Sequence, residues 1–341
     1  MGDTIRPVSD QSPPKPQRSL TAAAIVFFVL GLVVLAWNIP LPLVAWSPGP
    51  VGDASAAVIV EGHPVQQPHG ELLMLTVESQ PLNAFEAVVA GIDPTVDVLA
   101  RNRVRKPGVS DEQYQRLNLQ MMDQSTATAI TVALSKLNLE AQADKVFITG
   151  YAASTPAGKV LRIGDQITAI EGKKVTGVDD LAPALAGKKP GDTIRLTVLR
   201  SGEEHTYDIE LAENPDTPGQ AFIGIFIRQL PFWIDVNPGI VGGPSAGMMY
   251  TLAIIETLSN GDLAHGHVVA GTGTISPDGK VGAIGGVRQK VVAAEAAGAE
   301  YMLVPQANYD AAMTAPRHSM ELKRVSTIDD ALAFLASLPA A

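Results

Sequence analysis

Ser245 has the residue type and the surroundings of a catalytic nucleophile. It follows glycines and a proline, and it opens an apolar run with helical spacing. The first N–H groups of a helix lack internal partners and carry the positive end of the helix dipole. A serine at such a turn can attack a carbonyl carbon while the N–H groups stabilise the oxyanion. The sequence therefore predicts a nucleophile turn over residues 241–249, in which Gly243, Pro244 and Ala246 surround Ser245.

A serine nucleophile needs a base, and Lys290 is the candidate. Residues 287–297 have helical character and are flanked by glycines. At about 100° per residue, Lys290 shares an arc with Val287, Val291 and Ala294. Burial makes the charged amine costly and lowers its pKa, which makes the neutral amine a usable base. The alternative is a lysine that extends from a core face into solvent.

Three motifs in this order resemble the proteolytic domain of Lon-type proteases. They are Gly-Pro-Ser-Ala-Gly at 243–247, Gly-Thr-Gly-Thr-Ile at 271–275, and Gly-Lys-Val-Gly-Ala-Ile-Gly-Gly at 279–286, which runs into Val-Arg-Gln-Lys. The resemblance implies that Ser245 and Lys290 form a Ser-Lys dyad and that Thr272 supports the lysine. It covers roughly residue 221 to the C-terminus. The whole chain resembles the membrane-anchored, PDZ-containing Lon-like proteases of bacteria, and the resemblance also implies a homo-oligomer.

Composition narrows the class of protein. The 341 residues carry a formal net charge of −10 and include no cysteine. The acidic balance argues against nucleic-acid binding, and the absence of cysteine excludes disulfides and thiolate metal sites. His265 and His267 have no third ligand nearby, and the segment 273–280 has the wrong spacing for a phosphate loop. We therefore expect no metal and no cofactor, ATP included.

The N-terminal residues indicate a membrane anchor. Residues 1–19 are polar and proline-rich, which predicts a disordered cytoplasmic tail. Residues 20–37 are almost wholly apolar and are long enough for a transmembrane helix. Arg6, Lys15 and Arg18 precede this segment, and no lysine or arginine follows it before Arg101. The positive-inside rule therefore places the bulk of the chain outside the cytoplasm. The alternative is a cleaved signal peptide.

Residues 38–144 are expected to form an extracytoplasmic N-terminal region with strands and a long helix. Its proline-rich start predicts an extended exit from the membrane, and residues 56–60 and 71–77 are expected strands. Asn83 should cap a helix that Pro94 interrupts, and Ser110 with Gln113 should cap a helix running towards Leu137. The basic run 101–106 is expected to be a solvated loop; binding of anionic lipid or nucleic acid is the alternative.

Residues 145–212 resemble a bacterial PDZ domain. Strands are expected at 146–149, 193–200 and 204–211, with a short helix over 178–185. PDZ domains bind peptide ends by strand addition. The family's carboxylate-binding loop has no clear counterpart before Val146, so a spacer or gate role remains the alternative to peptide capture.

The proteolytic domain is expected over residues 221–341. Residues 221–228 should be its first strand, and residues 232–236 should lead into the nucleophile turn. Asp235 on that strand is a further residue that can approach the site, in a role that the sequence leaves open. The alternation of strands with helices predicts an α/β (α+β) fold for this part of the chain.

Together these observations predict an ATP-independent, membrane-anchored serine endopeptidase. Its substrates would be peptides or unfolded protein segments outside the cytoplasm, since no motor is present to unfold folded ones. The first alternative is a catalytically silent PDZ-type membrane adaptor. The second is an enzyme that uses the same dyad to cleave small esters or amides.

Overall fold

The computed structural model describes residues 25–341 except 29, 32, 33, 35, 36, 67, 107, 153, 154, 240–242 and 260. The chain forms two compact units. The smaller consists of Met1–Ser47 and Glu78–Pro107, and the larger of Pro48–Val77 and Gly108–Ala341. The expected disordered tail and part of the expected transmembrane helix lie outside the described residues. Within the described part of the chain, no helix is both long and apolar enough to span a bilayer.

The larger unit is built on a sheet with the strand order β18-β17-β14-β3-β1. β14 runs parallel to both β3 and β17, and β17 runs parallel to β18. Along β3, Leu72 and Met74 pack into one core, while Leu73 and Leu75 pack into the other. This alternation shows a sheet buried on both faces. The strands are β1 (Pro40–Asp53), β3 (Glu71–Asn83), β14 (Val268–Gly271), β17 (Tyr301–Pro305) and β18 (Glu321–Val325).

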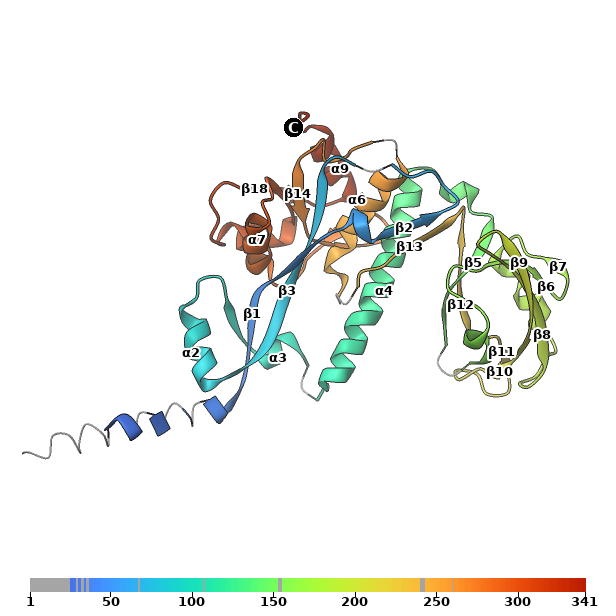
Figure 1. Cartoon of the computed structure of the whole chain (residues 1–341), viewed down its shortest axis with the longest axis horizontal. Helices are drawn as coiled ribbons and strands as arrows, with labels where there is room; N and C mark the ends of the chain where they lie inside the picture. The colour runs from blue at the N-terminus through green and yellow to red at the C-terminus, as the bar shows by residue number, and fades with distance from the viewer. Residues whose placement is uncertain are drawn as a thin grey trace, which may run out of the picture. The chain divides into compact units, whose positions relative to one another are not determined.

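Helices cover the two faces of this sheet, as Figure 1 shows. One core contains residues of α4, α6 and α9, and the other contains residues of α7 and α8. This part of the chain is therefore a three-layer α/β arrangement, which agrees with the expected fold class. The helices are α4 (Asp111–Lys136), α6 (Gly247–Leu258), α7 (Val287–Ala296), α8 (Tyr309–Met313) and α9 (Ile328–Ala336).

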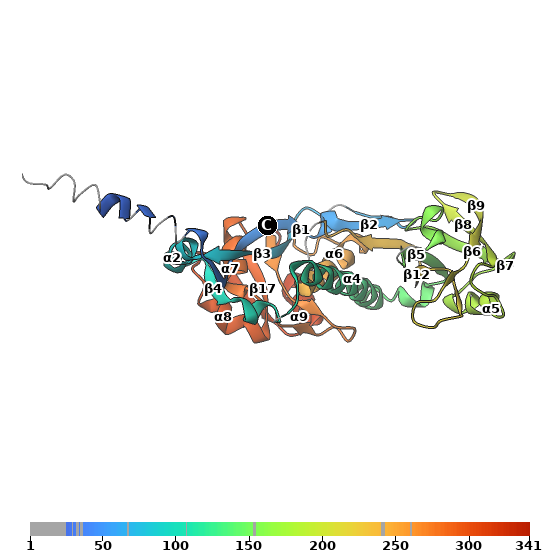
Figure 2. The same cartoon turned by 90° about the horizontal axis from the view of Figure 1, so that it is seen from below.

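The expectation of a separate N-terminal region is corrected by the strand pairing. β3 pairs with β14, and β2 (Val58–Glu61) pairs antiparallel with β13 (Trp233–Val236). Figures 1 and 2 show β2 beside β13. α4, which carries the expected capping box of Ser110 and Gln113, packs on α6. Because β3 is apolar on both faces, it is stable only between helix layers, and those layers come largely from beyond residue 246.

A second sheet of the larger unit has the strand order β12-β5-β6-β8-β9, with β7 beside β6. It has its own core, which includes Ile148, Ile194 and Leu196. The strands are β5 (Lys145–Tyr151), β6 (Gln166–Ile170), β7 (Lys173–Lys174), β8 (Thr193–Arg200), β9 (Glu203–Glu210) and β12 (Ile225–Leu230), and the helix α5 (Ala182–Leu185) also belongs to this module. We call this module, residues 145–230, the β-rich module.

The position of β12 corrects a second expectation. Residues 221–228 were expected to begin the proteolytic domain, but β12 pairs antiparallel with β5. Ile223, Ile225 and Ile227 pack in the core of the β-rich module, which explains why β12 stays with that sheet. The β-rich module is therefore inserted between α4 and β13, two elements that share one core.

The smaller unit contains α2, β4 and α3. α2 (Ala84–Ile92) has the expected cap, in which Asn83 and Glu86 exchange hydrogen bonds. β4 (Asp97–Ala100) pairs with residues 43–46 of β1, so the expected extended exit is in fact a sheet strand. The basic run expected as a loop begins with one turn of helix, α3 (Arg101–Val104). The remaining short strands of the chain are β10 (Ala212–Glu213), β11 (Ala221–Phe222), β15 (Thr274–Ile275) and β16 (Val281–Gly282), and the 3₁₀ turns include η4 (Val178–Asp180) and η5 (Pro244–Ala246).

Candidate active site

Ser245 lies in the turn η5, immediately before α6. Gly243 adopts a φ of +97°, a conformation that favours glycine, and it starts this turn. Its N–H donates to the carbonyl oxygen of Asn118 at 3.1 Å, and the hydroxyl of Ser125 donates to the carbonyl oxygen of Pro244 at 3.2 Å. Both partners belong to α4. This helix precedes the inserted β-rich module in the chain, and the serine turn that it contacts follows the module.

Gly247 allows this close packing. A Cβ atom at this position would lie 2.5 Å from Ser125 Oγ and 2.8 Å from Ile275 Cγ2. The start of α6 can therefore sit against α4 and β15 only because residue 247 has no side chain. Gly247 therefore determines how closely the turn that carries Ser245 packs against α4 and β15.

Lys290 meets Ser245 at the centre of the site. Lys290 Nζ lies 2.7 Å from Ser245 Oγ, and the lysine donates the hydrogen bond in its charged form. Lys290 is only 2% exposed, whereas Ser245 is half-buried. The arc predicted for α7 is observed, because Val287, Val291 and Ala294 are buried in the same core. The structure thus brings together the two residues that the sequence singled out.

Burial lowers the pKa of Lys290 from 10.5 to about 7. The physical cause is desolvation, which penalises the ammonium but not the neutral amine. Among the described residues no carboxylate forms an ion pair with Lys290, and a neighbouring carboxylate would raise its pKa again. A substantial share of the lysine is therefore neutral near pH 7 and able to accept a proton.

Thr272 connects the two halves of the site. Its Oγ1 accepts a hydrogen bond from Lys290 Nζ at 2.9 Å and donates to the carbonyl oxygen of Ser245 at 3.1 Å. The N–H of Gly273 donates to the same carbonyl oxygen at 2.8 Å. The segment after β14 therefore fixes both the backbone of the serine and the position of the amine.

Other residues considered from the sequence have partners outside the Ser245–Lys290 pair. Asp235 pairs in register with Ile59 of β2, burial raises its pKa, and its charged neighbours are Arg228 and Asp123. His267 Nδ1 lies 2.8 Å from Glu300 Oε2, so this histidine has a structural partner. The described residues include no group of three or more His, Cys, Asp or Glu side chains placed to hold a metal ion.

Sequence reasoning missed the contribution of α4 to the site. Asn118 and Ser125 touch the serine turn, but more than one hundred residues separate them from it in the chain. The capping box of α4 predicts a helix and gives no indication of what that helix packs against. Only the pairing of distant elements reveals these two contacts.

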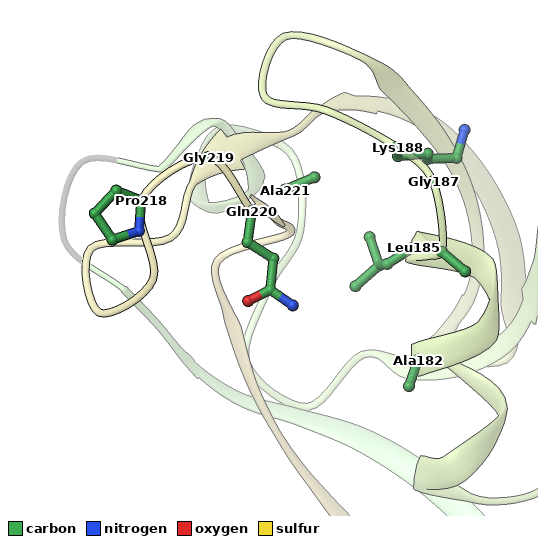
Figure 3. A pocket seen from close by; sticks show the side chains of 9 residues that line it. Ala182, Leu185, Gly187, Lys188, Pro218, Gly219, Gln220 and Ala221 are labelled. Atoms are coloured by element: carbon green, nitrogen blue, oxygen red, sulfur yellow. The ribbon is translucent and has the colours of Figure 1, made fainter.

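The β-rich module contains a cavity of about 500 Å³. It is lined by α5 and the residues after it, including Leu185 and Lys188, and by the segment Pro218–Ala221, as Figure 3 shows. The ammonium of Lys188 points to the carbonyl oxygen of Thr193 at 2.8 Å and lies 3.4 Å from Glu171. β12, which follows this segment, is at the edge of its sheet.

Comparisons with known protein families match two parts of the chain. Residues 128–211 match the PDZ domain family, and residues 232–337 match the Lon protease (S16) C-terminal proteolytic domain. The chain therefore contains a proteolytic domain of a serine peptidase family together with a PDZ domain. The first match starts inside α4 and ends before β12, so it does not follow the limits of the β-rich module.

Several curated proteins are similar over parts of the chain. The Lon protease of Campylobacter concisus is 37% identical over 111 residues, which is 31% of this chain and 14% of that protein. The Lon protease of Desulfosudis oleivorans is 29% identical over 164 residues, which is 47% of this chain and 18% of that protein. The chain thus spans less than a fifth of these relatives.

The comparison with solved structures returns PDZ domains that match a quarter of the chain. The crystal structure of the PDZ domain of an SdrC-like protein from Listeria monocytogenes is 28% identical. The match covers 25% of this chain and 87% of that one, with a TM-score of 0.23.

Proposed function

We propose that this protein is a serine endopeptidase that works without ATP. The observation that carries the proposal is the 2.7 Å contact between Ser245 Oγ and the buried Nζ of Lys290. In the reactive state the amine is neutral and accepts the proton of the serine hydroxyl as the oxygen attacks the scissile carbonyl. The resulting ammonium then donates this proton to the leaving amine as the scissile C–N bond breaks and an acyl-serine forms. A water molecule, deprotonated by the same amine, then hydrolyses the acyl-serine, and the proton returns to the serine oxygen. Thr272 holds the amine in line with the hydroxyl during these transfers.

The oxyanion of the tetrahedral intermediate needs donors at the serine turn. Within residues 243–248, the N–H groups of Gly243, Gly247 and Met248 already donate to the carbonyl oxygens of Asn118, Pro244 and Gly273. Pro244 has no N–H. The proposed donors are therefore the N–H groups of Ser245 and Ala246. An oxyanion donor contributes on the order of 3 kcal/mol to the stability of the transition state.

The proposed substrates are peptides or unfolded protein segments. The proposal rests on the match of residues 128–211, which include most strands of the β-rich module, to PDZ domains. PDZ domains bind extended peptides by adding a strand to a sheet edge. β12 is such an edge, and the cavity beside the segment Pro218–Ala221 would receive the side chain at the peptide end. With no unfolding motor proposed, a folded substrate would have to open by itself before cleavage.

We further propose that residues 20–37 anchor the protein in the cell membrane with the N-terminus in the cytoplasm. The apolar length of this segment and the basic residues before it support this orientation. The catalytic residues would then act outside the cytoplasm. The resemblance to Lon-type domains also supports a homo-oligomer of undetermined size.

Cleavage of an unstructured protein by the detergent-solubilised full chain, without ATP, tests the proposal. We expect cleavage by the parent and none by Ser245→Ala or Lys290→Met. Lys280→Met is the matched control, because Lys280 is an exposed lysine paired with Asp278. A fluorophosphonate probe separates the adaptor hypothesis from a latent enzyme, since an activated Ser245 reacts with the probe even where no protein is cut. Failure of the probe to label the parent, or equal labelling of Lys290→Met, would refute the dyad.

A further inference from the structure

The smaller unit carries a helix whose large apolar side chains point away from the protein. On α2, Phe85, Val88, Val89 and Ile92 are 39%, 69%, 49% and 80% exposed. Their spacing of three, four and seven residues places them on one face of the helix. The half-buried positions of α2 are alanines, so the usual arrangement of large residues inside and polar residues outside is reversed.

This apolar face is joined to the end of the apolar segment 20–37. The ring of Trp37 stacks on the ring of Phe85 at 5.4 Å. The N–H of Ala84 donates to the carbonyl oxygen of Ile39 at 3.2 Å. The first turn of α2 is thus joined to the residues at which the chain would leave a bilayer. Figures 1 and 2 both show α2 close to the start of β1, which follows these residues.

The charges around α2 suit a membrane surface. α2 contains no lysine or arginine, and its one carboxylate, Glu86, accepts the cap hydrogen bond from the N–H of Asn83 at 2.9 Å. The same unit exposes the side chains of Arg101, Arg103 and Lys106 in and after α3. Carboxylates of the same segment, Glu78, Asp93 and Asp97, precede this basic run, so any attraction comes from the local cluster and not from the net charge of the unit. Clustered cations near an apolar helix favour anionic headgroups.

We propose that α2 lies in the lipid interface as a second membrane contact, with its apolar face in the acyl region and the basic residues of α3 at the headgroups. The inference rests on the proposed membrane anchor and adds to it. A single helix fixes only the point of attachment, whereas two contacts also fix the orientation of the unit on the membrane. The partner is the lipid bilayer, and a second copy of the chain is the competing occupant of this face.

The absence of cysteine from the chain allows a direct test. Val88→Cys carries an environment-sensitive fluorophore in the full-length protein, reconstituted in phosphatidylcholine vesicles with and without phosphatidylglycerol. Lys173→Cys, on the exposed strand β7, is the matched control. We expect doxyl lipids to quench the label at residue 88 but not the label at residue 173. Arg101→Glu together with Arg103→Glu should reduce the quenching in vesicles that contain phosphatidylglycerol and leave it unchanged in those without it.

Three results would overturn the proposal. One is a label at residue 88 that remains accessible to aqueous quenchers. Another is quenching that survives Val89→Asp combined with Ile92→Asp. The third is a label that is shielded from water but is not quenched by doxyl lipids. If this shielding is lost when fewer protein molecules are placed in each vesicle, α2 contacts a second copy of the chain and not the lipid. Flotation of the protein with the vesicles tests the proposed anchor separately. Protein that floats with the vesicles while its label at residue 88 remains accessible to aqueous quenchers contradicts the α2 contact but not the anchor.

Discussion

The environment of Lys290 predicts the pH dependence of the reaction of Ser245. Burial disfavours the ammonium, so the neutral amine dominates above the lowered pKa of about 7 and is lost as the pH falls below it. For a base with this pKa, the neutral fraction rises from roughly 9% at pH 6 to roughly 91% at pH 8, a gain of about tenfold that then levels off. A lysine with an ordinary pKa would instead gain about 100-fold over this range and continue to rise by about tenfold per pH unit.

The assay is the rate at which a fluorophosphonate labels Ser245 between pH 5.5 and pH 9.5 at constant ionic strength. Ser245→Ala gives the background. Lys290→Arg keeps a cation that does not deprotonate in this range, so its rate should fall by about 10²- to 10⁴-fold and should not recover at high pH. A parent rate that still climbs tenfold per unit above pH 8 would show that Lys290 is not held neutral by burial. A Lys290→Arg profile equal to the parent's would show that another group is the base.

The same pKa shift fixes the sign of a stability effect. The difference between 10.5 and about 7 is about 3.5 units, which corresponds to about 5 kcal/mol against the charged form in the folded protein. Between these two values the unfolded chain holds a proton that the folded chain lacks, so folding becomes more favourable as the pH rises. Replacement of Lys290 by methionine should remove this slope, and urea unfolding at several pH values, followed by tryptophan fluorescence, would measure it.

Three further changes test other parts of the structure. Thr272→Val removes the acceptor 2.9 Å from Lys290 Nζ, so kcat should fall by roughly tenfold with little change in KM, as steady-state peptide cleavage would show. Burial raises the pKa of Glu256 to about 7, so between pH 4.5 and about 7 the folded protein holds a proton that the unfolded chain lacks. The folded protein therefore loses stability, by at most about 3 kcal/mol, as the pH rises through this window. Glu256→Gln should abolish this loss, which urea unfolding at several pH values would measure. Arg200→Ala leaves the buried carboxylate of Asp165 without its two 2.7 Å donors and should destabilise the β-rich module by about 3–5 kcal/mol, whereas an unchanged melting temperature would contradict this account.

The local features of the chain were predictable from the sequence because their signals are local. Asn83 caps α2 as expected, and Ser110 forms the expected capping box with Gln113. The partner of Asn83 in its capping box, Glu86, was not predicted. The serine turn and the apolar arc of Lys290 follow from residue types within a few helical turns. Chemical need made Lys290 the candidate base for Ser245, and the resemblance to a family implied the dyad, but no spacing in the chain encodes the 2.7 Å contact itself.

The strand partners could not be predicted in the same way. β3 is an apolar strand that could join any parallel sheet, and nothing in its sequence specifies β14 as its neighbour. β12 alternates apolar residues as a strand of either sheet would, and only its contacts with the core of the β-rich module assign it there. For the same reason the sequence placed the start of the proteolytic domain at residue 221, although α4, which contacts the serine turn, lies before residue 221.

The insertion of the β-rich module also sets an order of events during synthesis. A ribosome delivers β1, β3 and α4 first, but β14, which pairs with β3, begins only at Val268. The β-rich module has all of its strands once Leu230 has emerged and can fold while its host is still open. Ser245 cannot meet Lys290 until α7 has been made. The nascent chain is itself an unfolded polypeptide and could be a substrate. We therefore expect Ser245 to lack its base, and so to be unable to cleave the chain, until most of the chain has been made.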